Sequence, residues 1–217
     1  MRSGTGVATV SGPVSERRAA ILGAAAVLFA ERGFHGATID ELGRAVGTSG
    51  PALYRHFAGK EALLAAVLVD VSERLSRWGG ELVACSGTPE QALESLLRGH
   101  IAFALDEPAL ITVHDRELGH LAEGDRHRVR RLQRGYVEVW VDVLARLRPG
   151  TGRVRLRAAV HAVFGLLNST PHSHGELPRE AMAELLLAMG TAALLTEPGA
   201  APGRAPSPES HGLGRSC

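Results

Sequence analysis

Between residues 13 and 196, apolar residues recur almost throughout at the three- and four-residue spacing of amphipathic helices. No stretch shows the sustained alternation of β-branched or aromatic residues, flanked by hairpin turns, that marks a strand. About nine helices are expected, near residues 15–32, 38–45, 49–56, 60–84, 89–105, 108–121, 125–148, 152–169 and 178–196. The sequence therefore predicts an all-α fold.

Two of the expected helices begin with a capping box, in which a threonine at the N-cap is followed three residues later by Glu or Gln. One box runs from Thr38 to Glu41 and the other from Thr88 to Gln91. Inside the fourth expected helix, the pair Gly79–Gly80 either ends the helix early or bends it.

Bulk composition places few limits on the partners. The chain has 217 residues, of which 45% are apolar, and a formal net charge of +1. Any positively charged surface that binds nucleic acid must therefore be local. Residues 1–12 and 197–217 are rich in Gly, Ser, Pro and Ala without apolar periodicity, so both are expected to be disordered tails.

The expected location is the cytoplasm, without a membrane partner. Cys85 and Cys217 lie outside any metal-ligand or redox spacing, as suits a reducing compartment. Arg17 and Arg18 precede an apolar stretch of signal-peptide length, but no small-residue cleavage site follows before Glu31. The stretch is also shorter than the ~18 residues of a membrane span.

Residues 38–57 have the pattern of a helix, a tight turn and a second helix. The first helix ends near Val46, Gly47 supplies the turn, and Ser49 can cap the second helix. Apolar side chains can meet inside this corner: Ile39, Leu42, Val46, Leu53 and Phe57. The residues predicted to stay largely outside are Ser49, Gly50, Pro51, Ala52, Tyr54, Arg55 and His56.

This outward face suits duplex DNA. Its small residues let the start of the second helix approach base edges in a major groove. The Tyr54 hydroxyl, the His56 imidazole and the Lys60 ammonium can then meet phosphates. The alternative is a structural corner that never meets DNA, and residues 15–62 carry only six Lys or Arg against five Asp or Glu.

Residues 38–64 read TIDELGRAVGTSGPALYRHFAGKEALL. This run resembles the DNA-binding signature of the TetR family of bacterial transcriptional regulators. The resemblance implies a three-helix DNA-binding head over residues 13–59 and a helical ligand-binding and dimerisation body over residues 60–196. It also implies a homodimer that acts on a palindromic operator. Gly43 and Thr48 replace residues that are commonly Ala and Val, and Gly50 lacks a side chain that other members use on bases.

The resemblance implies that Thr38, Tyr54, His56 and Lys60 contact the DNA backbone, while residues 49–52 lie against bases. The complete set of expected DNA contacts is Arg17, Thr38, Arg44, Thr48, Ser49, Gly50, Pro51, Ala52, Tyr54, Arg55, His56 and Lys60.

Residues 152–196 are expected to form the dimer interface. The first of its two helices is apolar nearly all round from Ala158 to Leu167, so a partner must cover it. The second helix repeats the pattern with Met182, Leu185, Leu186, Met189 and Ala193. Two such helices per chain would build an isologous four-helix interface.

The resemblance implies that the body binds a small apolar or acyl effector between its long helices; the alternative is that the aromatic residues there only pack the core. The residues predicted to line that site are Trp78, Phe103, His114, Trp140, His161, Phe164, Asn168 and His172. Residues 161–172 resemble a segment of actinobacterial TetR members linked to lipid catabolism. Five arginines between Arg126 and Arg134 form either a solvated face or a mouth for an anionic effector such as an acyl-CoA.

No cofactor or metal is expected, since no histidine spacing matches a known metal motif. The predicted function is a ligand-responsive repressor and not an enzyme. The alternatives are a metal sensor or a helical enzyme that uses body histidines, such as His114 beside Asp115, and a dimerisation scaffold without sequence preference.

Overall fold

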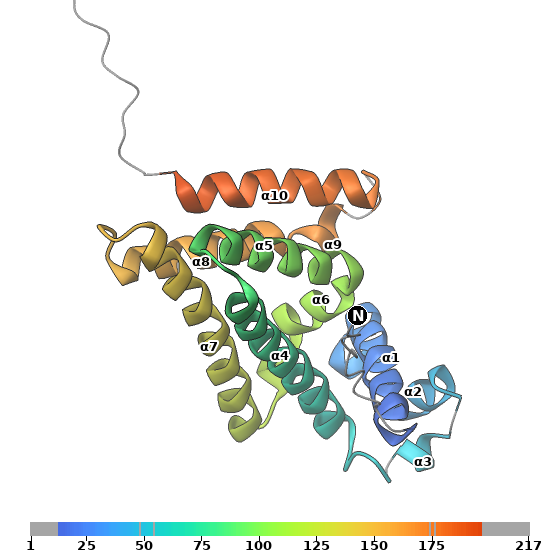
Figure 1. Cartoon of the computed structure of the whole chain (residues 1–217). Coiled ribbons are helices and arrows are strands. Elements are labelled where there is room, and N and C mark those ends of the chain that lie inside the picture. Colours follow the sequence, from blue (N-terminus) through green and yellow to red (C-terminus); the bar gives the residue numbers. More distant parts are fainter. Residues whose placement is uncertain (1–12, 48, 54, 174, 176, 197–217) are drawn as a thin grey trace, which may run out of the picture.

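The computed structural model describes residues 13–47, 49–53, 55–173, 175 and 177–196, and the two expected tails lie outside these ranges. Within them the chain is helical and contains no strand. The helices, shown in Figure 1, are α1 (Pro13–Gly36), α2 (Ile39–Ala45), α3 (Gly50–Leu53), α4 (Lys60–Cys85), α5 (Pro89–Asp106), α6 (Pro108–Glu117), the 3-10 turn η1 (Leu118–His120), α7 (Glu123–Leu147), α8 (Arg153–Leu167), α9 (Thr170–Ser173) and α10 (Arg179–Leu195). No described helix is both long and apolar enough to cross a bilayer.

Each expected helix has a counterpart, with three differences. The third helix is a single turn, Gly50–Leu53, and not residues 49–56. The helix expected at residues 108–121 ends at Glu117 and continues as the 3-10 turn η1, and the short helix α9 was not expected. The fourth helix passes through Gly79 and Gly80 without a break, so the suggested early end was wrong.

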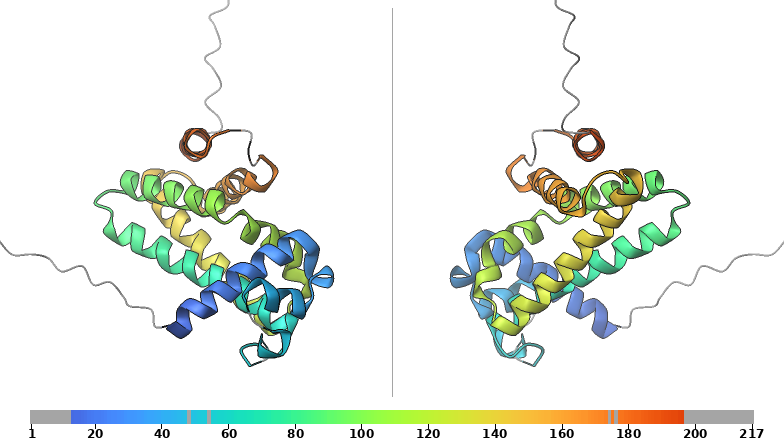
Figure 2. Two further views of the ribbon diagram at one scale, coloured as in Figure 1. Left: turned by 90° about the vertical axis from the view of Figure 1, so that its right-hand side faces the viewer. Right: turned by 90° about the vertical axis from the view of Figure 1, so that its left-hand side faces the viewer.

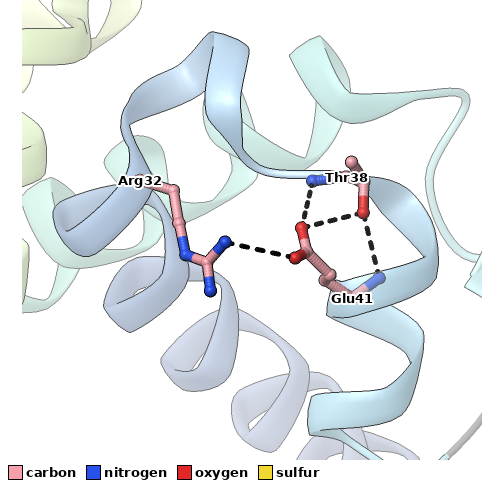
Figure 3. Close-up of polar contacts among 3 residues, drawn as sticks. All are labelled: Arg32, Thr38 and Glu41. Atoms are coloured by element: carbon pink, nitrogen blue, oxygen red, sulfur yellow. Dashed lines mark hydrogen bonds and ion pairs between the residues drawn. The ribbon is translucent and has the colours of Figure 1, made fainter.

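The capping box at Thr38 is confirmed, as Figure 3 shows. The Thr38 hydroxyl accepts a hydrogen bond from the Glu41 backbone N–H at 3.2 Å, and the Glu41 carboxylate accepts from the Thr38 backbone N–H at 3.1 Å. Arg32 of α1 lies 3.4 Å from the same carboxylate. The start of α2 is therefore stabilised by hydrogen bonds within its first turn and by an ion pair with α1.

The box at Thr88 is only half formed. Its hydroxyl accepts from the Gln91 N–H at 3.3 Å, but the Gln91 side chain accepts from the Gly87 N–H and not from that of Thr88.

The helices are arranged as a small head joined to a layered body (Figures 1 and 2). Helices α1, α2 and α3 form the head, and α6 packs on α1. The long helices α4 and α7 lie side by side and lead to a layer of α5 and α8, which α10 covers. Figure 2 shows α10 end-on as the outermost helix of the body.

Two hydrophobic cores stabilise this arrangement. One core joins the head to the first half of α4, where Leu63, Leu64 and Leu68 are fully buried, and to Val113 of α6. The other fills the body around Trp140. Because the head shares its core with α4 and α6, a displacement of either helix would change the packing of the head.

Helix α4 continues through its glycines because one of them is needed for packing. A Cβ on Gly79 would lie 2.6 Å from Cε2 of Tyr136 on α7, whereas a Cβ on Gly80 would meet nothing within 4 Å. Gly79 therefore allows α4 and α7 to approach closely at the Tyr136 ring.

We predict opposite effects for the two alanine substitutions. Gly80→Ala should raise the free energy of unfolding by ~0.5–1 kcal/mol through helix propensity. Gly79→Ala should lower it by ~1–3 kcal/mol, because the Tyr136 ring must move. Urea unfolding followed by circular dichroism at fixed protein concentration measures both. Equal stabilisation by the two substitutions would contradict the close approach of α4 and α7.

The capping box predicts a pH dependence. Hydrogen bonds from the Thr38 side chain and backbone hold the pKa of Glu41 below its ordinary value of 4.5. A carboxyl whose pKa is lowered by folding stabilises the fold above its unfolded value, and this contribution is lost as the pH falls through the lowered pKa. Carboxyl NMR titration should find the Glu41 pKa depressed in the wild type and returned toward 4.5 in Thr38→Val. A Glu41 pKa unchanged by that substitution would be evidence against the box.

Candidate nucleic-acid interface and internal cavity

The corner between α2 and α3 forms as the sequence predicts. Gly47 has φ of 66°, in the left-handed region that favours glycine, and turns the chain after α2. Leu42, Leu53 and Phe57 are buried inside the corner, with Ile39 and Val46 packed against them. In Figure 1 this corner lies at the far end of the head from α10.

Gly50 does not lie on the outward face, so that part of the prediction was wrong. It is buried, and a Cβ there would collide with the Asp40 carboxylate of α2. The start of α3 thus lies so close to α2 that position 50 has no room for a side chain.

The remaining described residues of the predicted face are accessible. Ser49, Arg55 and His56 are exposed, and Ala52 is half-buried. The Ser49 hydroxyl accepts from the Ala52 N–H at 3.3 Å and caps the short helix. Arg17 on α1 and Arg44 at the end of α2 are also exposed. Thr48, Tyr54 and the side chain of Pro51 lie outside the described residues.

Lys60 has a structural role at the base of the head. Its ammonium donates to the Ala37 carbonyl at 2.9 Å and lies 3.5 Å from the His35 carbonyl. It also lies 4.6 Å from the centroid of the Phe34 ring, in a cation–π contact. Lys60 therefore fastens the start of α4 to the segment between α1 and α2. Its contact with phosphate stays a prediction, as does that of Thr38, whose hydroxyl caps α2.

The body contains a cavity of about 250 Å³ between α4, α5, α6, α7 and α8. Five of the predicted effector residues line it: Phe103, His114, His161, Phe164 and Asn168. Other lining residues include Val71, Leu75, Leu110, Ile111 and Val137, so most of its wall is apolar.

Three predicted residues do not line this cavity. Trp78 lines a separate cleft between α4 and α5, together with Arg74 and Glu107. Trp140 is fully buried behind the wall, with its ring edge-on to Phe164 at 5.1 Å. His172 is exposed on α9.

Aromatic rings form one wall of the cavity around His100, which was not among the predicted site residues. The His100 ring stacks on Phe164, with ring centroids 4.7 Å apart and planes at 4°, and on Tyr136 at 5.9 Å. Its Nδ1 lies 3.2 Å from the Tyr136 hydroxyl, and its Nε2 lies 3.0 Å from Oδ1 of Asn168. Burial lowers the pKa of His100 to about 4, so the ring is neutral at physiological pH.

The opposite wall belongs to α6, which also reaches the head. Leu110, Ile111 and His114 line the cavity, and His114 is hydrogen-bonded to Gln133 of α7. Six residues after His114, η1 places the His120 ring on Phe34 of α1, with centroids 5.0 Å apart and planes at 17°. One short helix therefore contacts both the cavity and the head.

Among the described residues, no group of three His, Cys, Asp or Glu side chains is arranged to hold a metal ion.

Comparison with known proteins matches both parts of the chain. The family model described as bacterial regulatory proteins of the tetR family matches residues 21–67. The model described as the tetracyclin repressor-like C-terminal domain matches residues 86–194.

Individual relatives agree with these matches. The transcriptional repressor KstR2 of Mycobacterium tuberculosis is 28% identical over 136 residues, which cover 62% of this chain and 68% of the relative. FadR from Bacillus subtilis, solved with stearoyl-CoA, has a TM-score of 0.66 at 16% identity and covers 81% of this chain and 98% of its own. AibR, solved with isovaleryl coenzyme A and operator DNA, has a TM-score of 0.66 at 22% identity. The match covers 80% of this chain and 97% of the AibR chain.

The family models cover the head, with its helix-turn-helix corner, and the helical body with its cavity, so the chain belongs to the TetR family of bacterial transcriptional regulators.

Proposed function

We propose that this regulator is a homodimeric repressor, acting in the cytoplasm, that releases a palindromic operator when a small acyl effector enters the cavity. The observation that carries the proposal is the geometry of the α2–α3 corner. Ser49, Arg55 and His56 are exposed there, and α3 packs on α2. A recognition helix must be accessible in this way if it is to enter a major groove.

The outer surface of α8 and α10 supports the homodimer. Leu185 and Met189 on α10 are 44% and 47% exposed, while their neighbours Met182 and Leu186 face the core. On α8 the exposed residues Ala158, Ala162 and Gly165 are small, which allows a second helix to approach closely. A copy of the same face covers these residues, and two-fold symmetry then sets the two α3 helices about one DNA turn, ~34 Å, apart.

The cavity supports an effector with a short or branched acyl chain. Its volume of about 250 Å³ holds roughly eight groups of the size of water, at ~30 Å³ each. FadR and AibR, which have the same fold, were solved with acyl-CoA molecules. Gln133 of α7 lines the cavity, and Arg130 and Arg126 precede it by three and seven residues, on the same helical face. These arginines suit the phosphates of a coenzyme A moiety.

Helix α6 is the proposed link between effector and operator. An effector that displaces Leu110, Ile111 or His114 also displaces Glu117 and His120, which pack against the end of α1. The spacing or tilt of the two heads then no longer matches the operator. For this switch, the effector needs to bind the released state more tightly than the DNA-bound state by only ~2–5 kcal/mol.

The DNA contact is tested by salt dependence. For DNA upstream of its own coding sequence, fluorescence anisotropy should show binding that weakens linearly on a log–log plot against salt concentration. Arg55→Ala should reduce the slope by ~0.9 for each head, since it removes one phosphate contact. Arg98→Ala, which removes an exposed arginine paired with Glu94 on α5, is the control and should leave the slope unchanged. Equal slopes for the wild type and Arg55→Ala would show that Arg55 makes no contact with DNA phosphates.

The dimer is tested on α10. The double substitution Leu185→Glu and Met189→Glu should convert the protein to a monomer in light scattering at micromolar concentration, because it places four carboxylates in a desolvated two-fold interface. DNA affinity should then fall at least about tenfold. Val27→Glu, at a position on α1 that is 49% exposed, is the matched control and should remain dimeric. A dimer that survives the double substitution must use another surface.

A further inference from the structure

The hydrogen bonds of His100 have a fixed direction. A neutral imidazole has one donor and one acceptor nitrogen, and here both nitrogens have a partner. The partner of Nε2 is Oδ1 of Asn168, a carboxamide oxygen that can only accept. Nε2 therefore carries the proton, and Nδ1 must accept from the Tyr136 hydroxyl.

This direction leaves one hydrogen-bond donor unused on the cavity wall. The Asn168 amide nitrogen has no hydrogen-bond partner among the described residues, although Asn168 lines the cavity. The Tyr136 hydroxyl has already donated its proton to Nδ1 of His100, so it offers the cavity no donor. The wall therefore presents one donor, the Asn168 NH₂, close to a ring of aromatic side chains.

The surroundings of that donor favour an uncharged partner. Phe164 stacks on His100, and Trp140 lies edge-on behind both rings, so the wall beside Asn168 is apolar. His100, which is hydrogen-bonded to Asn168, is neutral because burial lowers its pKa to about 4. A carboxylate placed here would lose its hydration without gaining a cation.

We propose that Asn168 selects the effector by donating a hydrogen bond from Nδ2 to the oxygen of an uncharged carbonyl group, whose attached apolar chain packs on Phe164 and Tyr136. A ketone or a thioester carbonyl satisfies this requirement, whereas a hydrocarbon of the same shape leaves the amide unpaired. The inference rests on the proposed function, in which the cavity is the effector site.

The direction of the network can be tested without a ligand. Long-range ¹H–¹⁵N NMR of protein labelled at histidine should show His100 neutral at pH 7, with its proton on Nε2. In Asn168→Asp, the carboxylate beside Nε2 should raise the His100 pKa, so that the ring is protonated at a higher pH than in the wild type. A wild-type ring protonated on Nδ1 would reverse every hydrogen bond in the network and overturn the proposal.

The selectivity can be tested with two probes of equal shape, heptan-2-one and 2-methylhept-1-ene, in which a CH₂ group replaces the carbonyl oxygen. Calorimetry should show that the wild type binds the ketone about tenfold tighter. Asn168→Leu should bind both probes equally, and Ser169→Ala, which removes an exposed hydroxyl bonded to the Leu166 carbonyl, should keep the preference.

The outcomes separate the two proposals. Equal binding of both probes by the wild type would overturn the role of Asn168 while leaving the cavity as a binding site. A wild type that binds neither these probes nor any acyl-CoA would overturn the effector site itself, and the inference with it.

Discussion

The contact between the end of α6 and the end of α1 is the constraint on which the rest of the structure depends. Phe34 is stacked on His120, and Glu117 is buried beside Gly33, whose φ of 69° ends the regular part of α1. The Lys60 ammonium binds the Ala37 carbonyl, just after α1, and lies over the Phe34 ring. The head is therefore not a free module on a linker. It is clamped between α4 and α6, and the same two helices form walls of the cavity. A packed seam of this kind has few alternative arrangements, so a small displacement in the body becomes a change in head position.

Polar groups are used differently in the two halves of the molecule. In the head, the polar side chains of Thr38, Glu41 and Lys60 satisfy backbone groups at helix ends, which makes the corner rigid before any DNA arrives. Rigidity lowers the entropic cost of binding. In the body, the polar side chains of His100, Tyr136 and Asn168 pair with one another across a 68-residue separation and leave hydrogen-bonding capacity directed at the cavity.

Local patterns predicted the helices and the corner well, since a capping threonine, a turn glycine and apolar periodicity act within a few residues of one another. Features that depend on distant residues were not predictable. The role of Gly79 is set by Tyr136, and the burial of Gly50 is set by Asp40. Phe103, His114, His161, Phe164 and Asn168 stand among apolar neighbours in the sequence and line the cavity, whereas Trp140 is fully buried behind its wall. His100 was missed, although one signal in the sequence pointed to it. The spacing of His100 to Phe103 and of Tyr136 to Trp140 places each pair on one helical face, and this was the available signal.

In the proposed function, two copies of the α2–α3 corner read duplex DNA together. The most direct measurement is selection of the full-length protein on a pool of random double-stranded DNA, followed by sequencing of the bound fraction. The account predicts an enriched inverted repeat whose half-sites are centred about one helical turn, ~10 base pairs, apart, or a multiple of it. A bound fraction with no enriched sequence, or with a single half-site and no symmetry, would contradict it.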